Sequence, residues 1–337
     1  MQKNNLNEMY RGKSILITGG TGSLGKALTK HIIENFKDIK KLVIFSRDEQ
    51  KQFQMAQEFP ESKYPFMRYF IGDVRDKDRL VRAFKGIDFV IHAAAMKHVH
   101  IAEYNPDECI KTNIGGAQNV VSASIETGVS GVVALSTDKA CSPINLYGAT
   151  KLTSDKLFIA ANKIKGDNPV VFSVVRYGNV MGSNGSVIPF FKKRAKTGIF
   201  PITHPEMTRF NISIEEGVNL VFFALENSRG GELYVPKIPS YNILDIAKAI
   251  DKNCKIDIIG IRPGEKIHEE MISSSDSHYT YDIGDKYVIL PSFYSSIDFF
   301  ISKFNALKVK EDFNYNSKEN SEYETVDSLK MKILKFF

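Results

Sequence analysis

Residues 18–25 read TGGTGSLG and directly follow the apolar run Ser14–Thr18, which is typical of a strand. The three glycines at positions 19, 22 and 25 permit a tight turn into a helix and let a pyrophosphate approach the helix-end N–H groups. A glycine loop can also be a purely structural turn, but its place between strand and helix favours dinucleotide binding. We therefore predict cofactor contacts from Gly19, Thr21, Gly22, Ser23, Leu24 and Gly25.

Downstream of this loop, short β-branched runs alternate with longer amphipathic segments, the rhythm of repeated strand–helix–strand units. This rhythm predicts an α/β fold: a doubly wound parallel Rossmann sheet with a smaller C-terminal substrate-binding lobe. The expected strands are Ser14–Thr18, Lys41–Ser46, Phe66–Ile71, Phe89–Ala93, Gly131–Ser136 and Val170–Arg176. Helices are expected to begin near Gly22, Asp48, Asp76, Asp107 and Ile144. Several begin with an acidic residue, which suits a helix N-terminus.

The chain is expected to divide into three regions. Residues 12–177 form the predicted NADP-binding Rossmann domain, and residues 178–291 form mainly the substrate-binding lobe, which can exchange elements with the first domain. Within that lobe a helix is expected near Ile188–Lys196. Residues 292–337 are rich in Lys, Asn, Ser and Glu, so we expect a polar C-terminal extension that is loosely packed or partly disordered.

Composition excludes several classes of protein. The net charge of +6 comes from 45 basic and 39 acidic residues without a long run of one sign, so no nucleic-acid partner is expected. Three cysteines suggest no disulfide framework, and the seven histidines show no metal-ligand spacing, so no metal is expected. Met1–Arg11 is polar, and no stretch approaches the ~18 apolar residues that span a bilayer. We expect a cytoplasmic protein without a membrane partner.

The end of the second strand predicts which cofactor binds. Arg47, with Lys51 a turn later, can pair with a 2′-phosphate and favours NADP. In the alternative, both are surface charges and Asp48 binds the ribose of NAD. Further contacts are expected beside the adenine and along the middle of the cofactor, where small residues leave room. These candidates are Ser46, Asp73, Val74, Ala93 and Ala94.

A tyrosine and a lysine follow the fifth strand at a spacing of four. This spacing places Tyr147 and Lys151 on one face of a helix, where the ammonium can make the phenol a usable proton acceptor and also bond the cofactor's ribose. Such a spacing arises often by chance, but its place after the fifth strand of this sheet favours catalysis. We predict that both residues bind the cofactor and take part in the reaction.

Three polar residues end the fifth strand itself: Thr137, Asp138 and Lys139. They lie at the carboxyl edge of the predicted sheet, where open α/β folds bind ligands. An acid and a base side by side are more than an alcohol dehydrogenase needs, but an elimination requires both. A surface Asp–Lys pair at a helix start is the alternative interpretation.

Whole motifs of the chain resemble those of the inverting UDP-N-acetylglucosamine 4,6-dehydratases, extended short-chain dehydrogenases/reductases that begin pseudaminic acid synthesis. The resemblance covers about Gly12 to Pro291, and its most specific part is STDKA together with LYGATK. Sugar 4-epimerases share the fold and the Tyr–Lys pair, while retaining dehydratases usually have Asp-Glu where this chain has Asp138-Lys139. The motifs are TGGTGSLG, SRDE, GDVRD, HAAAMKHV, AEYNPDECIKTNI, STDKA, INLYGATK, VVRYGNV and IIGIRPGEK.

The resemblance implies a hydro-lyase reaction in which the NADP cofactor ends as it began. Tyr147 would take the proton of the 4-hydroxyl, and Thr137 would hold the 4-oxygen. Lys139 would remove the C5 hydrogen, and Asp138 would protonate the departing 6-hydroxyl. A lysine can act as a base only if its pKa is lowered, which burial beside Lys151 and the oxidised nicotinamide is expected to achieve.

The resemblance also implies further contacts with cofactor and substrate, and association as a dimer or hexamer. Arginines and a lysine suit a diphosphate, and a carboxylate suits the uridine ribose. Two residues depart from the family pattern: His100 stands where proline is expected, and Asn211 where an aromatic residue is usual. Val180 is expected at the cofactor, and the expected UDP-N-acetylglucosamine contacts are Lys97, Thr137, Asn179, Arg209, Arg262 and Glu265.

Alternatives remain at the level of function. A UDP-sugar 4-epimerase would share the fold and the Tyr–Lys pair, but would not need Lys139. A noncatalytic dinucleotide sensor would keep the glycine loop without a reason to keep the Asp–Lys pair. The same dehydration also serves capsule or O-antigen sugar synthesis, which one sequence does not separate from flagellin glycosylation.

Overall fold

The computed structural model describes residues 8–182, 187–294 and 297–336, so positions 1–7 of the polar N-terminus and positions 295, 296 and 337 of the expected extension lie outside the described residues. The chain forms two compact units. The first takes the chain up to Ser136, Thr150–Val175 and Val218–Tyr234. The second takes Thr137–Ala149, Arg176–Gly217 and the chain from Val235 on. Each unit therefore contains segments from the other's stretch of sequence.

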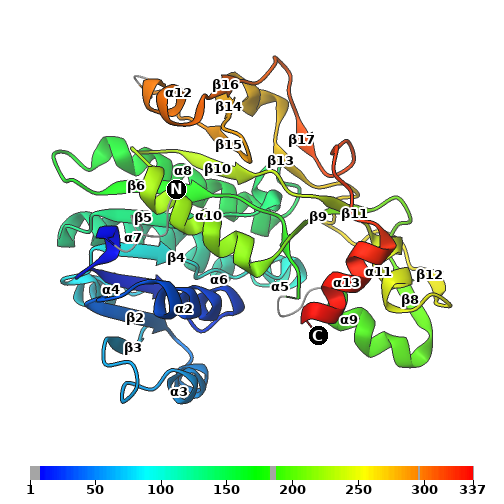
Figure 1. Cartoon of the computed structure of the whole chain (residues 1–337), viewed down its shortest axis with the longest axis horizontal. Coiled ribbons are helices and arrows are strands. Elements are labelled where there is room, and N and C mark those ends of the chain that lie inside the picture. The colour runs from blue at the N-terminus through cyan, green and yellow to red at the C-terminus, as the bar shows by residue number, and fades with distance from the viewer. Residues whose placement is uncertain (1–7, 183–186, 295–296, 337) are drawn as a thin grey trace. The chain divides into compact units, whose positions relative to one another are not determined.

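The first unit is built on a parallel sheet with the strand order β10-β6-β5-β4-β1-β2-β3 (Figure 1). The order reverses between β1 and β4, which makes this point the topological switch of a doubly wound fold. The predicted fold class is confirmed, and the six expected strands are correct to within one residue at each end. The strands are β1 (Ser14–Thr18), β2 (Lys41–Ser46), β3 (Met67–Ile71), β4 (Phe89–His92), β5 (Gly131–Leu135), β6 (Val171–Val175) and β10 (Leu233–Pro236).

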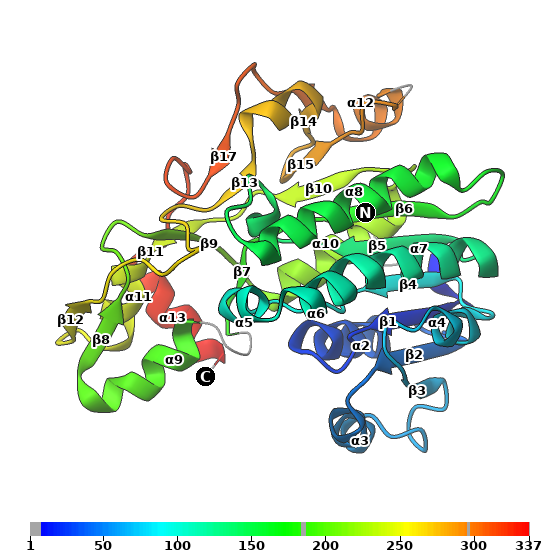
Figure 2. The same cartoon turned by 180° about the vertical axis from the view of Figure 1, so that it is seen from behind.

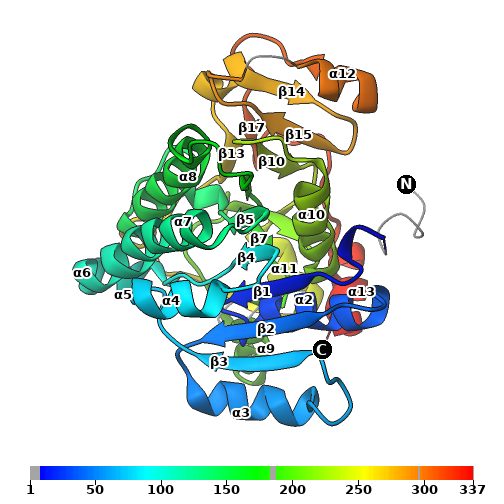
Figure 3. The same cartoon turned by 90° about the vertical axis from the view of Figure 1, so that its left-hand side faces the viewer.

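Helices cover both faces of this sheet. One face carries α4 (Lys77–Phe84), α7 (Gly116–Thr127) and α8 (Leu146–Ile164), and the other carries α2 (Ser23–Asn35) and α10 (Ile214–Asn227), as Figures 2 and 3 show. Because both faces are covered, the strands are almost uninterrupted apolar runs, and every residue of β1 is buried.

The predicted helix starts are confirmed to within two residues. Asp48 begins α3 (Glu49–Glu58) and Asp76 begins α4 as side-chain caps, accepting hydrogen bonds from the backbone N–H groups of Lys51 and Arg79. The helix expected near Asp107 is more complex. It starts as α6 (Pro106–Ile110), passes through the π-helical turn η1 (Lys111–Gly115) and continues as α7; α5 (Val99–Tyr104) precedes it.

The second unit consists of short strands and helices. Its small sheets pair β11-β9-β7, β12-β8 and β13-β17, and its antiparallel strands β16-β14-β15 belong to the same ten-stranded sheet as β10. The helix expected near Ile188–Lys196 is α9 (Val187–Arg194), followed by η3 (Ala195–Thr197). The other elements are η2 (Asp138–Ala140), β7 (Asn179–Val180), β8 (Ile199–Ile202), β9 (Thr208–Ile212), β11 (Ser240–Asn242), α11 (Ile243–Ile250), β12 (Lys255–Ile258), β13 (Glu270–Ile272), η4 (Ser274–Tyr279), β14 (Thr280–Asp282), β15 (Lys286–Ile289), α12 (Asp298–Phe304), β16 (Leu307–Lys308), β17 (Tyr315–Asn316) and α13 (Val326–Phe336).

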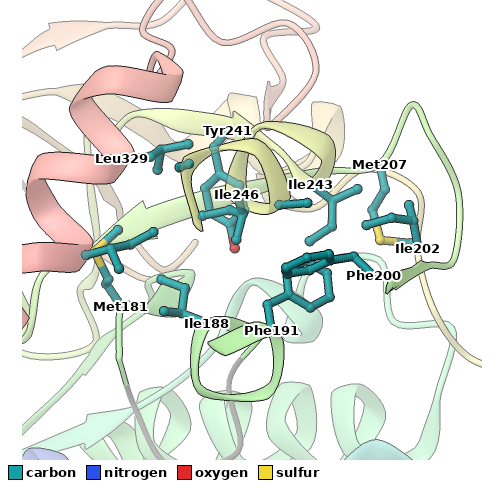
Figure 4. Packing of buried hydrophobic residues seen from close by; sticks show 13 residues of the cluster. Met181, Ile188, Phe191, Phe200, Ile202, Met207, Tyr241, Ile243, Ile246 and Leu329 are labelled. Atoms are coloured by element: carbon teal, nitrogen blue, oxygen red, sulfur yellow. The ribbon is translucent and has the colours of Figure 1, made fainter. Parts of the chain in front are cut away.

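The expectation of a loosely packed C-terminal extension is wrong for its described residues. Leu329 and Ile333 of α13 are buried in an apolar cluster with α9, α11 and β8 (Figure 4). Asn211, one of the two departures from the family pattern, donates from Nδ2 to Glu324 Oε1 at 3.0 Å and so helps to hold this segment. The segment is polar in composition, but it contains an apolar pair at positions i and i+4, Leu329 and Ile333, which lies on one face of the helix and packs against the cluster.

None of the described helices is long and apolar enough to cross a bilayer.

Replacement of Leu329 by alanine should destabilise the protein by about 2–5 kcal/mol, because the side chain is fully buried and leaves a cavity. The measurement is the free energy of unfolding in urea. The matched control on the same helix is Leu334→Ala, at a side chain that is 72% exposed, which should change stability by less than about 0.5 kcal/mol. Equal losses from both variants would show that α13 does not dock through this face.

Candidate active site

The glycine loop of the first unit is packed so closely that side chains do not fit. Gly19 has φ +66°, and a Cβ there would lie 2.8 Å from the backbone nitrogen of Ala94; a Cβ on Gly25 would lie 2.3 Å from the carbonyl oxygen of Gly20. Gly22 begins α2 without a side-chain cap, and the first turn carries no acidic residue. The helix start therefore offers backbone N–H groups and a positive dipole end, which fits a diphosphate at Thr21–Gly25.

The ribose-reading corner lies at the end of β2. Thr21 Oγ1 donates to Ser46 Oγ at 3.2 Å. The Asp48 carboxylate caps its own helix and lies 3.2 Å from Lys51 Nζ, so it already has partners. The Arg47 side chain is 62% exposed and 3.9 Å from the Asp73 carboxylate. The guanidinium at this corner is therefore exposed, while the carboxylate beside it is already engaged.

Asp73 and Val74 follow β3, and both have structural partners. Asp73 Oδ2 accepts hydrogen bonds from Arg75 Nε at 3.0 Å and Nη2 at 2.7 Å. Burial alone would raise the pKa of Asp73, but the bonds from Arg75 outweigh it and lower that pKa. Val74 is buried, and its Cγ2 lies 2.8 Å from where a Cβ on Gly116 would be. The side chain of Val74 therefore packs closely over the start of α7.

A buried hydrogen-bond chain fixes the end of β4. Thr18 Oγ1 lies 2.8 Å from His92 Nδ1 and accepts from the backbone N–H of Ala94 at 3.3 Å. Burial, and after it the charge of Lys151, lower the pKa of His92 to about 3, so this histidine stays neutral. Ala93 and Ala94 are partly buried next to it, while Lys97, further along the same loop, is exposed.

Asn113 is a residue of this region that sequence reasoning missed. It accepts from the backbone N–H of Met96 at 2.8 Å and donates to the Met96 carbonyl at 3.0 Å and to Thr150 Oγ1 at 3.0 Å. One side chain thus ties the loop after β4 to α8. The motif KTNI contains this asparagine, but nothing in the sequence indicates that it faces the loop.

Tyr147 and Lys151 occupy the first two turns of α8, as the spacing predicts. Both are buried, with exposed fractions of 8% and 3%. Burial lowers the pKa of Lys151, and Asp155 only partly opposes it. Burial, and then the nearby phenol of Tyr147, raise the pKa of Tyr177.

The second unit brings the predicted Asp–Lys pair into a larger buried charge cluster. Lys139 Nζ donates to Asp138 Oδ1 at 3.0 Å and lies 2.9 Å from Glu269 Oε1. Thr137 Oγ1 donates to the same Asp138 oxygen at 2.9 Å. The carboxylates are 1% exposed and the lysine side chain 22%. Gly148, which follows Tyr147, packs on the carbonyl of Lys139, so the first turn of α8 lies against this cluster.

The lowering expected from burial beside Lys151 and the oxidised nicotinamide stays a prediction, because the protein's own groups raise the Lys139 pKa. Burial alone would lower it, but the two carboxylates outweigh burial and raise the pKa of Lys139. Burial and then the Glu269 charge raise the pKa of Asp138, which favours its acid form. Burial would also raise the pKa of Glu269, yet Lys139 and Arg209 outweigh it and lower that pKa. The cluster therefore favours a protonated lysine and an ionised Glu269, and it shifts Asp138 toward its acid form.

Glu269 is the main functional candidate that sequence reasoning missed. It lies just beyond the IIGIRPGEK motif and is followed by a second glutamate, Glu270, so the sequence does not tell which one faces inward. Among the described residues, neither Glu269 Oε2 nor Asp138 Oδ2 has a hydrogen-bond partner. Buried carboxylate oxygens without partners are costly and suit a site that receives a polar ligand.

Arg209 lies beside this cluster, but its donors already bind protein. It is buried and donates to the carbonyls of Thr208 at 2.7 Å, Lys266 at 2.9 Å and Ile267 at 3.0 Å. It also lies 3.6 Å from Glu265 Oε1 and 3.5 Å from Glu269 Oε1. Arg209 thus holds the 265–269 loop, so its role as a diphosphate contact stays a prediction.

The remaining predicted contacts have local partners in the second unit. Arg262 and Glu265 belong to one exposed turn, in which the backbone N–H of Glu265 donates to the Arg262 carbonyl at 3.1 Å. Asn179 is hydrogen-bonded to the buried Tyr241, and Val180 follows it in β7. The described residues contain no group of three metal-ligating side chains.

Comparison with known proteins finds relatives that match most of the chain. Residues 15–291 match the family model described as polysaccharide biosynthesis protein. The chain is 58% identical over 322 residues to a UDP-N-acetylglucosamine 4,6-dehydratase (inverting) of Campylobacter jejuni, covering 93% of this chain and 94% of the relative. A UDP-glucose 4-epimerase of Rickettsia canadensis is 45% identical, covering 83% and 84%. The solved structure of Pen from Bacillus thuringiensis has a TM-score of 0.88 and 36% identity, covering 97% and 98%.

Replacement of Gly19 by alanine should destabilise the first unit more than replacement of Gly86. Both glycines have nearly the same φ, +66° and +68°, so both variants carry a backbone penalty of about 1–2 kcal/mol. Only at Gly19 would the new Cβ overlap with backbone atoms, and nothing lies within 4 Å at Gly86. Thermal unfolding should show a distinctly lower Tm for Gly19→Ala, and equal values would rule out the close approach to Ala94.

Proposed function

This chain belongs to the polysaccharide biosynthesis protein family, and from that premise we propose that it is an inverting 4,6-dehydratase of UDP-N-acetylglucosamine. This hydro-lyase would form UDP-2-acetamido-2,6-dideoxy-β-L-arabino-hexos-4-ulose. The proposal is supported by the 58% identity to the Campylobacter relative of that name. It is also supported by the chemistry of the residues that end β5.

The observation that carries the proposal is the buried Asp138–Lys139 pair with Glu269 on its other side. Loss of water from a sugar needs a group that removes a proton from carbon and another that gives a proton to the departing oxygen. The Lys139 amine and the carboxyl groups of Asp138 and Glu269 supply both kinds of group, and both carboxyl groups lie within 3.0 Å of Lys139 Nζ. Epimerisation at C4 alone would not require this additional acid and base.

In the proposed mechanism the glycine loop and Lys151 would hold a nicotinamide cofactor, which would supply the hydride chemistry needed at C4 and C6. Tyr147 accepts the 4-hydroxyl proton, and Lys151 orients that phenol from the next turn of α8. Thr137 holds the 4-oxygen. Asp138, whose raised pKa favours the acid form, gives its proton to the departing 6-hydroxyl, which leaves as water.

Lys139 needs a further proton step before it acts as a base. Because its pKa is raised, it carries its proton at neutral pH. That proton has to leave before the amine can act as a base, and the carboxyl oxygens within reach are Glu269 Oε1 at 2.9 Å and Asp138 Oδ1 at 3.0 Å. The neutral amine then takes the C5 hydrogen, which is acidic while C4 is a ketone, and return of a proton on the opposite face inverts C5.

The proposed cofactor is NADP rather than NAD. Arg47 is exposed at the corner that reads the adenosine ribose, and Asp48 is already bound by Lys51 and its own helix. As the reaction context we propose the first step of pseudaminic acid synthesis for flagellin or surface glycans. The same step in capsule or O-antigen sugar synthesis is the alternative.

Incubation of the protein with UDP-N-acetylglucosamine and NADP should give a nucleotide sugar lighter by one water. In deuterium oxide the product should carry deuterium at C5 with inverted configuration, which NMR reports directly. Lys139→Ala should abolish this reaction. A UDP-sugar 4-epimerase is the second candidate, favoured by the 45% identity to the Rickettsia relative. It would give a product of unchanged mass and would tolerate Lys139→Ala.

Removal of the Arg47 guanidinium should weaken NADP binding by about 10–100-fold, since a charge-assisted contact contributes about 1.5–3 kcal/mol. Binding of NAD should change little. The control is Arg11→Ala, at an arginine that is 71% exposed and 3.5 Å from Asp38. Calorimetric titration of both cofactors measures the effect, and an equal loss for NAD and NADP would contradict 2′-phosphate recognition by Arg47.

A further inference from the structure

Resting on the proposed dehydratase function, we infer that Glu269 is the positioning residue of the reacting centre, a buried carboxylate that clamps Lys139 against Asp138 and is itself held by Ser317 of the C-terminal segment. The inference extends the site beyond the predicted Thr137, Asp138 and Lys139. It also gives the C-terminal segment, which lies outside the matched residues 15–291, a part in the chemistry.

The clamp consists of two ion pairs that share one oxygen. Glu269 Oε1 lies 2.9 Å from Lys139 Nζ and 3.5 Å from Arg209 Nε. Lys139 also donates to Asp138 Oδ1 at 3.0 Å, so its ammonium is fixed between two carboxyl groups. Arg209 is fixed by three backbone carbonyls, and it therefore gives Glu269 a rigid support.

Ser317 makes hydrogen bonds with both the backbone N–H and the backbone carbonyl of Glu269. Its Oγ accepts from the Glu269 N–H at 2.9 Å, and its own N–H donates to the Glu269 carbonyl at 2.7 Å. The same Oγ lies 2.7 Å from Thr208 Oγ1, next to Arg209. Tyr323 donates from its hydroxyl to the Ser317 carbonyl at 2.6 Å. Ser317 is fully buried, and all its polar groups are used in fixing this corner.

A purely structural role does not account for Glu269. Arg209 has its carbonyl partners and Lys139 has Asp138, so neither requires a second buried carboxylate for its hydrogen bonds. Glu269 Oε2 has no hydrogen-bond partner among the described residues. A buried carboxylate with one unsatisfied oxygen carries a desolvation cost that its ion pairs offset only in part.

The charge of Glu269 acts on both proton carriers in the same direction. The charged and titratable groups facing it are Lys139, Asp138, Arg209 and Lys266; Tyr241 interacts with the first three of these, and Glu265 with Arg209. Its negative charge raises the pKa of Lys139 and also that of Asp138. Loss of that charge should therefore lower both pKa values and move the reaction's pH dependence to lower pH.

The first test needs neither substrate nor cofactor. The rate at which a small acylating reagent modifies Lys139 at a fixed, mildly alkaline pH reports the neutral fraction of the amine, and mass spectrometry of the peptide gives that rate. Glu269→Gln keeps the shape but removes the charge, so the rate should rise about tenfold or more, as expected for a pKa lowered by one unit or more.

Two variants separate charge from access. Glu269→Asp keeps the charge and opens space, and Glu270→Gln removes a neighbouring charge that binds Ser142 and Asn314 instead. Glu270→Gln should leave the Lys139 rate near that of the unmodified sequence, and Glu269→Asp should raise it much less than Glu269→Gln does. An unchanged rate in Glu269→Gln, or an equal rise in Glu269→Asp, overturns the inference. If Glu269→Gln does not fold, Ser317→Ala loosens the clamp instead, and it should raise the rate at least about threefold; an unchanged rate again overturns it.

The second test uses the proposed reaction. Glu269→Gln should lower kcat for dehydration with a smaller change in KM and shift the pH profile of kcat to lower pH, whereas general damage to the fold would lower the rate without moving the profile. An unmoved profile overturns the inference. A raised acylation rate in a protein that never dehydrates UDP-N-acetylglucosamine would leave the clamp standing and reject the proposed function, so the two failures are distinguishable.

Discussion

A lysine ammonium held between two buried carboxyl groups is the interaction around which the second unit is organised. Taking Lys139, Asp138 and Glu269 out of water is costly, and their mutual attraction offsets that cost only if each is held accurately. The structure supplies this accuracy through backbone contacts. Arg209 binds three carbonyls of the surrounding chain, and Ser317 binds the backbone N–H and the backbone carbonyl of Glu269. The short strands of this unit bring these anchors together.

The C-terminal segment contributes in two different ways. Leu329 and Ile333 add apolar area to a cluster with α9 and α11, which is ordinary core packing. Ser317 instead adds hydrogen bonds at the charge cluster. Ser317 directly follows Tyr315–Asn316, which pair with β13, the strand that begins directly after Glu269. The segment is therefore part of the candidate site as well as of the fold.

The first unit illustrates the opposite case, in which a site is made almost entirely by local rules. The tight approach of Gly19 to Ala94, the uncapped start of α2 and the capped start of α3 follow from residues within a few positions of one another or on adjacent strands. Small residues fit where the backbones come close, and a short acid caps a helix wherever that helix begins. Such features can therefore be predicted directly from the local sequence.

The sequence by itself determined the doubly wound sheet, its strand and helix boundaries, the glycine loop, and the placement of Tyr147 and Lys151 one turn apart on α8. These depend on short-range periodicity and on turn residues, which can be recognised in a single sequence. The tertiary structure alone decided that Glu269 rather than Glu270 faces Lys139, that Asn113 ties the loop after β4, and that α13 docks. It also decided that nearby carboxylates raise the pKa of Lys139, because the pKa of a buried group depends on charges that arrive from distant parts of the chain, and spacing along the sequence does not reveal them.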